Sequence, residues 1–172
     1  GASGHNFFGD RGIDGQKTAW RHEKVKFLAA QGFELCAHTL WHANLSKYSD
    51  AIVQEQIARN VLAIDSAVAG YKVRTLALPL GAWPKNRPLA WAGVWRDPKS
   101  GKEFRYAFDG VLEVSGAPVP SPATPQFNPH SLQRVQVVGN ELERMLDQLD
   151  RGGTRFVSAG TRAKIRPPQG NR

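Results

Sequence analysis

The spacing of apolar residues along the chain predicts helices and strands in alternation. The clearest helix lies between Ser49, its expected N-cap, and Gly70, its expected end. Its apolar positions recur at intervals of three and four residues, as in an amphipathic helix with one buried face: Val53, Ile57, Val61, Ile64 and Val68. A shorter helix is predicted from Thr18 to Gln31, with Gly32 as its stop.

Short apolar runs at residues 6–8, 33–36 and 73–78 predict strands around these two helices. The order strand, helix, strand, helix, strand predicts a parallel sheet with helices on its faces. In such folds functional residues gather at the carboxyl ends of the strands. The segments His38–His42 and Pro79–Gly81 both follow predicted strands. We therefore expect a site where these two segments meet.

The pattern is weaker beyond Gly81. Residues 104–114 predict a hairpin that turns at Asp109-Gly110. Residues 116–129 carry five of the eleven prolines and predict a stiff, irregular connection.

The last third of the chain predicts a strand at Leu132–Val138 and a helix from Asn140 to Gly152. The apolar face of that helix is expected to be Leu142, Met145, Leu146 and Leu149. A final strand is predicted at residues 155–157. We expect one domain over residues 1–160 and a basic, flexible tail over residues 161–172.

The composition is that of a soluble globular domain, since 41% of the 172 residues are hydrophobic and 22% are charged. No run of eighteen apolar residues exists, so no transmembrane helix is expected. The first ten residues do not read as a signal peptide, and no initiator Met is present. We expect the chain to begin inside a longer reading frame.

The net charge of +8 favours anionic partners, such as nucleic acid, an anionic cell wall or a membrane surface. The positive charges are scattered, and no RNA-binding aromatic signature appears, so specific nucleic-acid binding is not expected. Cys36 is the only cysteine, which excludes a disulfide framework and a cysteine zinc site. We expect Cys36 to be a small buried residue of its strand.

His38 and His42 are four residues apart. One helical turn would place both imidazoles on one face, within reach of a single ion. Two histidines, a carboxylate and an open water position form a hydrolytic site, in which the ion acidifies water and polarises a carbonyl. A chain with five histidines often has such a pair by chance, so the spacing alone leaves the metal site and an unrelated pair both open. The position after a strand favours the site.

Residues 32–45 resemble the second motif of the polysaccharide deacetylase family, also called the NodB homology domain, which reads Gly-x-Glu-(Ile/Leu)-x-x-His-(Ser/Thr)-x-x-His. Residues 6–8 and 155–158 resemble strands of the same family, so the resemblance spans most of residues 4–160. It implies an α/β fold, a distorted (β/α) barrel of the polysaccharide deacetylase type, here incomplete at the N-terminus. Family members remove acetyl groups from N-acetylglucosamine polymers or acetylated xylan.

The resemblance implies that His38 and His42 bind a divalent metal, most readily Zn²⁺, and that the Thr39 hydroxyl steadies the loop between them. It assigns the paired Asp of the first motif, as general base and third ligand, to a position before Phe7. Only six residues precede Phe7, and none is acidic. We therefore expect this fragment to be inactive as it stands.

Residues 76–81 resemble the family's Arg-x-Pro-x-Gly motif, which forms one wall of the substrate groove. Pro79 and Gly81 are retained, and the resemblance implies that the backbone amide of Leu80 binds the oxyanion. Ala77 stands in place of the arginine, for which Arg74 or Arg87 is a candidate substitute.

Two further candidates are less well defined. Trp83 either stacks on a sugar ring or packs as a core or loop residue. The family's late motif carries a histidine that acts as general acid, but Leu132–Val138 contains none. His130 is nearby and is either that acid or a surface loop histidine.

The sequence therefore predicts a metal-dependent hydrolase that removes acetyl groups from a polysaccharide such as peptidoglycan, chitin or xylan. The family implies an extracytoplasmic location. The alternative is a noncatalytic carbohydrate-binding or cell-wall-binding module on the same fold, which the missing arginine and late histidine favour. A basic domain that only binds anions is a third reading.

Overall fold

The computed structural model describes residues 20–114, 116–135 and 137–152. The predicted strands at residues 6–8 and 155–157 and the predicted tail lie outside the described residues. Three short 3-10 turns complement the helices and strands: η2 (Leu45–Lys47), η3 (Pro79–Gly81) and η4 (Arg87–Ala90). The helices are α1 (Arg21–Ala30), α2 (Asp50–Ala67) and α3 (Glu141–Gly152), and the strands are β1 (Thr75–Ala77), β2 (Ala92–Arg96), β3 (Glu103–Ala107), β4 (Gly110–Val114) and β5 (Leu132–Arg134).

Helix α2 confirms the periodicity seen in the sequence. Val53 and Ile57 are fully buried and Ile64 is 4% exposed, so the predicted apolar stripe faces the core. The helix begins directly after Ser49, but the Ser49 side chain makes no capping hydrogen bond. The carboxylate of Asp50 in the first turn is placed to interact favourably with the helix dipole.

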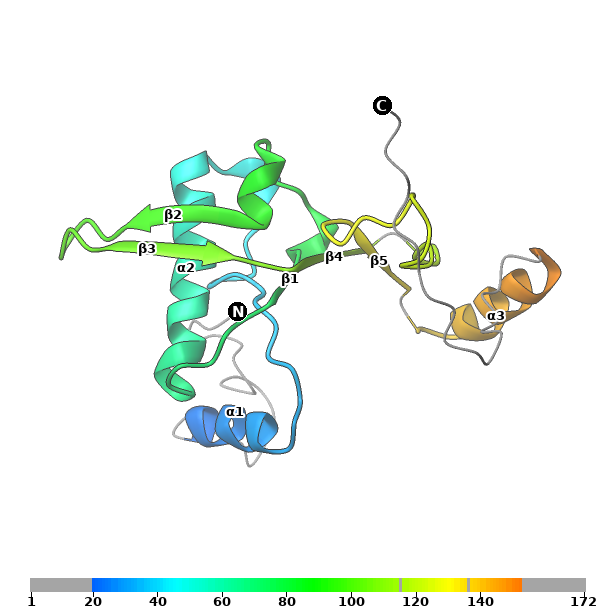
Figure 1. Ribbon diagram of the computed structural model, residues 1–172, viewed down its shortest axis with the longest axis horizontal. Coiled ribbons are helices and arrows are strands. Elements are labelled where there is room, and N and C mark those ends of the chain that lie inside the picture. Colours follow the sequence, from blue (N-terminus) through cyan, green and yellow to red (C-terminus); the bar gives the residue numbers. More distant parts are fainter. Residues whose placement is uncertain (1–19, 115, 136, 153–172) are drawn as a thin grey trace.

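A parallel sheet lies beside α2, and the predicted site segment Pro79–Gly81 follows its strand β1 (Figure 1). Its order is β1-β4-β5, with Leu76 opposite Val111 and Leu112 opposite Leu132. The predicted strand at residues 33–36 is reduced to a single parallel bridge between Ala37 and Leu76. The fold is thus mixed α/β with a parallel sheet. The described strands form no closed barrel, and the distorted barrel stays a prediction.

The predicted hairpin at residues 104–114 is wrong, because its two halves belong to different sheets. Strand β3 pairs antiparallel with β2, whereas β4 pairs parallel with β1. The turn between β2 and β3 is stabilised at Asp97, whose side chain accepts from the backbone N–H of Lys99 and whose carbonyl accepts from Gly101. Strand β4 has the continuous apolar start of a buried parallel strand, with Val111 fully buried.

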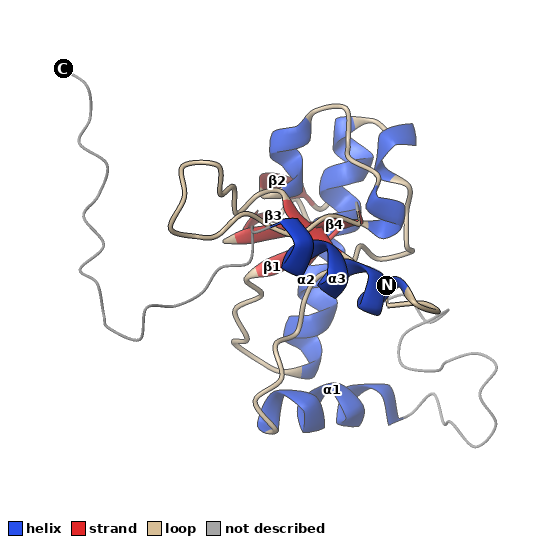
Figure 2. Cartoon of the chain, turned by 90° about the vertical axis from the view of Figure 1, so that its right-hand side faces the viewer, coloured by secondary structure: helices blue, strands red, loops and turns tan. Residues whose placement is uncertain are grey.

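The core lies between α2, the hairpin β2–β3 and the parallel sheet. Helix α1 lies at the lower end of the molecule in both Figure 1 and Figure 2. Helix α3 projects away from the sheet, and none of its described side chains is buried (Figure 1). Cys36 is exposed, so the expectation of a buried cysteine is wrong; its neighbours Leu35 and Ala37 take the buried positions. Among the described residues, no helix is long and apolar enough to cross a membrane.

Candidate metal and substrate site

The structure brings the two predicted ligands His38 and His42 side by side. Their ring centroids are 4.8 Å apart and the ring planes meet at 70°. Two imidazoles that bind one zinc ion through ring nitrogens at about 2.1 Å and a tetrahedral angle have centroids about 5 Å apart. The observed separation therefore fits two ligands of one ion. The segment between them is an irregular loop rather than the helical turn on which the spacing argument rested.

The His38 ring is oriented by the end of β1. Its Nδ1 lies 2.8 Å from the carbonyl oxygen of Ala77. A carbonyl only accepts, so Nδ1 carries the proton and Nε2 keeps the lone pair that a metal requires. Burial lowers the pKa of His38, and the opposing hydrogen bond to Ala77 does not reverse this shift. The hydrogen bond thus sets the tautomer of His38, and burial favours its neutral form, the two conditions that metal binding requires.

Backbone strain is concentrated at the predicted site. Among the described residues, the non-glycine residues with positive φ are Thr39 at 62°, His42 at 58° and Leu80 at 58°. Each such conformation costs about 1–3 kcal/mol and persists only where the surroundings hold it. All three lie in the two segments that follow the Ala37 bridge and strand β1. Strain of this kind is typical of functional sites.

Hydrogen bonds hold the histidine loop in this conformation. The fully buried Thr39 accepts from the backbone N–H of Ala43 through its hydroxyl at 3.0 Å, a bond that spans the second half of the loop. Asn60 on α2 accepts from the N–H of His38 at 2.7 Å. Gln56, one helical turn earlier, accepts from the N–H of Trp41 at 3.1 Å. The sequence analysis missed Gln56 and Asn60, although two amides beside an apolar helix stripe are a visible signal.

The segment Pro79–Gly81 forms a tight 3-10 turn at the carboxyl end of β1. The Gly81 N–H donates to the carbonyl of Leu78 at 3.1 Å and the Ala82 N–H to that of Pro79 at 3.0 Å. The backbone amide of Leu80 takes part in neither bond, and its side chain is 67% exposed. Because His38 contacts Ala77, this turn follows directly from the strand that orients the first histidine.

Trp83 belongs to a polar cluster that the sequence did not reveal. Its indole N–H donates to Glu113 at 2.7 Å, and the Ser131 hydroxyl donates to the other carboxylate oxygen at 2.5 Å. Desolvation would raise the pKa of Glu113, but these bonds and the charge of Arg87 leave it lowered. The Arg87 guanidinium lies 4.0 Å from the centroid of the Trp83 ring. The Trp83 indole is therefore fixed in place by β4 and by η4.

The remaining candidates lie apart from the histidine pair. His130 stacks on Trp91, with ring centroids 4.7 Å apart and an interplanar angle of 4°. It precedes β5, which lies three strand positions, or about 14 Å, from the Ala37 bridge that leads to His38. Arg74 pairs with Asp109 at 2.6 Å before β1 begins, so it lies at the opposite end of that strand.

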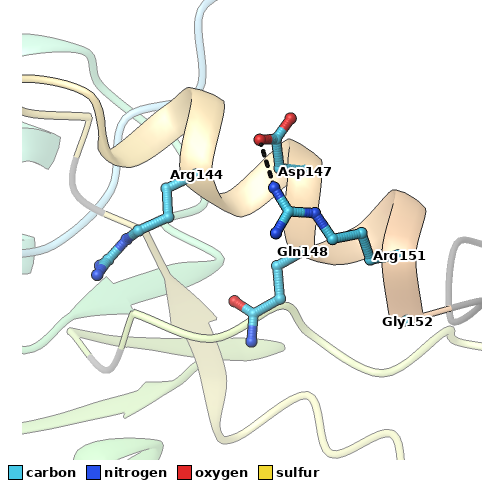
Figure 3. A pocket seen from close by; sticks show the side chains of 5 residues that line it. All are labelled: Arg144, Asp147, Gln148, Arg151 and Gly152. Carbon is cyan, nitrogen blue, oxygen red and sulfur yellow. Dashed lines mark hydrogen bonds and ion pairs between the residues drawn. The ribbon is translucent and has the colours of Figure 1, made fainter.

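Among the described residues, no group of three or more His, Cys, Asp or Glu side chains is placed to hold a metal ion. The histidine pair fits two coordination positions and leaves the others to ligands beyond this set. A separate hollow lies along α3 and is lined by Arg144, Asp147, Gln148, Arg151 and Gly152 (Figure 3). Arg151 donates to Asp147 there at 3.0 Å. None of the predicted site residues lines this hollow.

Comparison with known proteins gave one family. The sequence pattern described as "Polysaccharide deacetylase" matches residues 7–91, which include α1, α2, β1, the histidine loop and the Pro79–Gly81 turn. No match to a curated protein or to a solved structure was found. The match supports a polysaccharide deacetylase domain over residues 7–91 of this chain.

Proposed function

We propose that this chain acts in the deacetylation of a polysaccharide and that His38 and His42 hold a divalent ion, with Zn²⁺ the first choice. The carrying observation is the geometry of the pair: the ring centroids are 4.8 Å apart and His38 Nδ1 is engaged by Ala77. The family match supports deacetylation in general, and the donor chemistry of the two imidazoles supports zinc. A bound divalent ion would supply Lewis-acid polarisation of an acetyl carbonyl and activation of water.

The chain's own residues would position the substrate. In this proposal the turn Pro79–Gly81 forms one wall of the groove, and the Leu80 amide donates to the oxygen of the acetyl carbonyl as negative charge develops there. Trp83, fixed by Glu113, presents its indole to a sugar ring. We assign the protein to an extracytoplasmic location and a distorted barrel fold on the strength of the family.

A noncatalytic carbohydrate-binding or cell-wall-binding module remains the second candidate. Two observations favour it. Ala77 stands in place of the family arginine, and His130 is engaged with Trp91 rather than with the histidine pair. In this alternative Trp83 and the Pro79–Gly81 turn bind sugar, and no acetate is released.

The first experiment is calorimetric titration of the chain with Zn²⁺, because metal binding does not depend on the general acid or base. We expect one ion per chain, with affinity at least about tenfold weaker in His38→Ala and in His42→Ala. His130→Ala is the matched control and should bind metal as the parent does. A chain that binds no zinc even when it is extended upstream by the paired Asp that the family places before Phe7 would overturn the metal site.

The second experiment is acetate release from chitin oligosaccharides, peptidoglycan fragments and acetylated xylan in the presence of the metal, with the chain extended upstream by the paired Asp that the family places before Phe7. Release that is lost in His38→Ala would support the hydrolase, and the preferred polymer would name the substrate. Binding of a polymer without acetate release, unchanged in His38→Ala, would favour the binding module. His130→Ala also tests the acid role here, since loss of activity with normal metal binding would restore that assignment.

A further inference from the structure

Helix α2 supplies the hydrogen-bond acceptors for the backbone of the histidine loop. The His38 N–H donates to the side chain of Asn60, and the Trp41 N–H donates to the side chain of Gln56. In a third hydrogen bond, the Leu40 N–H donates to the backbone carbonyl of Gln56 at 3.0 Å. Three of the four consecutive residues from His38 to Trp41 are therefore tied to one face of α2.

The two amides are buried beside the apolar face of α2. Gln56 is fully buried and Asn60 is 3% exposed, on the same helix as the buried Val53 and Ile57. Burying an amide costs about 1–3 kcal/mol unless its polar atoms are satisfied. Gln56 Nε2 has no hydrogen-bond partner, so that residue carries part of this cost. Apolar residues at both positions would avoid it, which indicates that the amides serve the loop.

The loop requires such support because it is strained at both ends. Thr39 and His42 have φ values of 62° and 58°. A loop released from α2 would relax these residues toward ordinary conformations, because nothing would then offset their strain. Each relaxation would turn the neighbouring Cα–Cβ bond and so change the 4.8 Å spacing of the two imidazoles.

We infer that Gln56 and Asn60 are positioning residues that hold His38 and His42 in the arrangement required to share one metal ion; this inference rests on the proposed metal site. In this role they contact the backbone of the loop rather than the ion or the substrate. They act by fixing the backbone from which the first ligand extends, while Ala77 fixes its ring.

The test is the zinc affinity of the whole chain with near-isosteric variants that remove only the acceptors. Asn60→Leu and Gln56→Met should each weaken zinc binding about 10–100-fold, the range seen when support of a metal ligand is lost. Asn60→Asp keeps an oxygen acceptor and should return to within about threefold of the parent. Ile57→Val, a fully buried change on the same helix, is the control for destabilisation alone and should leave the affinity unchanged.

Hydrogen exchange at the His38 and Trp41 amides gives a second readout that needs no metal. We expect faster exchange in Asn60→Leu and Gln56→Met, respectively, and no local change in Ile57→Val. If the parent binds zinc and both acceptor variants bind it equally well, the inference is wrong while the metal site stands. If zinc is not bound even by the chain extended upstream by the paired Asp, the proposed metal site fails, and the inference fails with it. A variant that does not fold leaves the other acceptor variant to decide between these results.

Discussion

Replacing Gly81 by Ala should be strongly destabilising, because two separate effects act at this position. Gly81 has a φ of +65°, in the left-handed region that costs an L-residue about 1–2 kcal/mol. A Cβ at this site would also lie 3.2 Å from the backbone nitrogen and oxygen of Val114 and 3.3 Å from its Cβ. These atoms belong to β4, whose backbone cannot move without disturbing both neighbouring strands.

The magnitude follows from adding the two effects. Overpacking against a fixed neighbour costs about 1–3 kcal/mol, so Gly81→Ala should lower the free energy of unfolding by about 2–5 kcal/mol. Gly101→Ala is a matched control, since its φ is +71° and nothing lies within 4 Å of the added Cβ. It should cost only the backbone strain of about 1–2 kcal/mol. The entropy that alanine removes from the unfolded chain is shared by both variants and cancels in the comparison.

The assay is equilibrium unfolding in urea, followed by circular dichroism, with the parent and both variants side by side. The midpoint of Gly81→Ala should fall well below that of Gly101→Ala, with equal denaturant dependence. Equal losses in the two variants would refute the close approach of the Pro79–Gly81 turn to β4. The placement of that turn beside the sheet, and with it the groove wall assigned to it, would then be wrong.

Two further predictions concern the hydrogen bonds around the sheet. The lowered pKa of Glu113 implies stability that is present above the ordinary value of 4.5 and lost as pH falls through the lowered value. The difference in unfolding free energy between the parent and Glu113→Gln should therefore shrink below about pH 4.5, and a difference that grows with acid would contradict the bonds from Ser131 and Trp83. Tyr106 is 5% exposed, and its hydroxyl donates to the Leu89 carbonyl at 2.7 Å. Tyr106→Phe should therefore lower the free energy of unfolding in urea by about 1–2 kcal/mol. An unchanged free energy would mean that the Leu89 carbonyl finds another donor.

The elements best predicted from the sequence were those in which the hydrophobic pattern repeats over many residues. Helix α2 repeats its stripe over five turns, and the order of its neighbours predicted a parallel sheet. The hairpin was misplaced because Asp109-Gly110 is a strong turn signal in sequence alone. In the structure the N–H groups of both residues donate instead to the carbonyl of Arg74, which sends the chain beside β1. That choice is made by a partner 35 residues away, which no local pattern contains.

The candidate site divides in the same way. Because the carboxyl ends of parallel strands converge, the sequence predicted that the histidine loop lies near the Pro79–Gly81 turn. The hydrogen bond between His38 and Ala77, at the end of the strand that precedes this turn, agrees with that prediction. The fixation of Trp83 was not foreseen, because Glu113 lies 30 residues further along and is bonded through its side chain. Spacing also predicted a helical turn between the two histidines, and this was wrong because Thr39 and His42 adopt positive φ.

Gln56 and Asn60 show why the support of a site is harder to find in a sequence than the site itself. A metal ligand can be recognised in a sequence by its residue type, whereas an acceptor for a backbone N–H can be any residue with an oxygen atom in reach. The usable signal is a polar residue type at positions where the helix pattern predicts burial: two amides, four residues apart, on a helix that otherwise buries aliphatic side chains. A buried amide side chain requires a hydrogen-bond partner. The nearest backbone N–H groups without a partner in a helix or strand are those of the strained histidine loop. Such amides directly after a histidine pair therefore indicate where the loop is anchored before any coordinates are known.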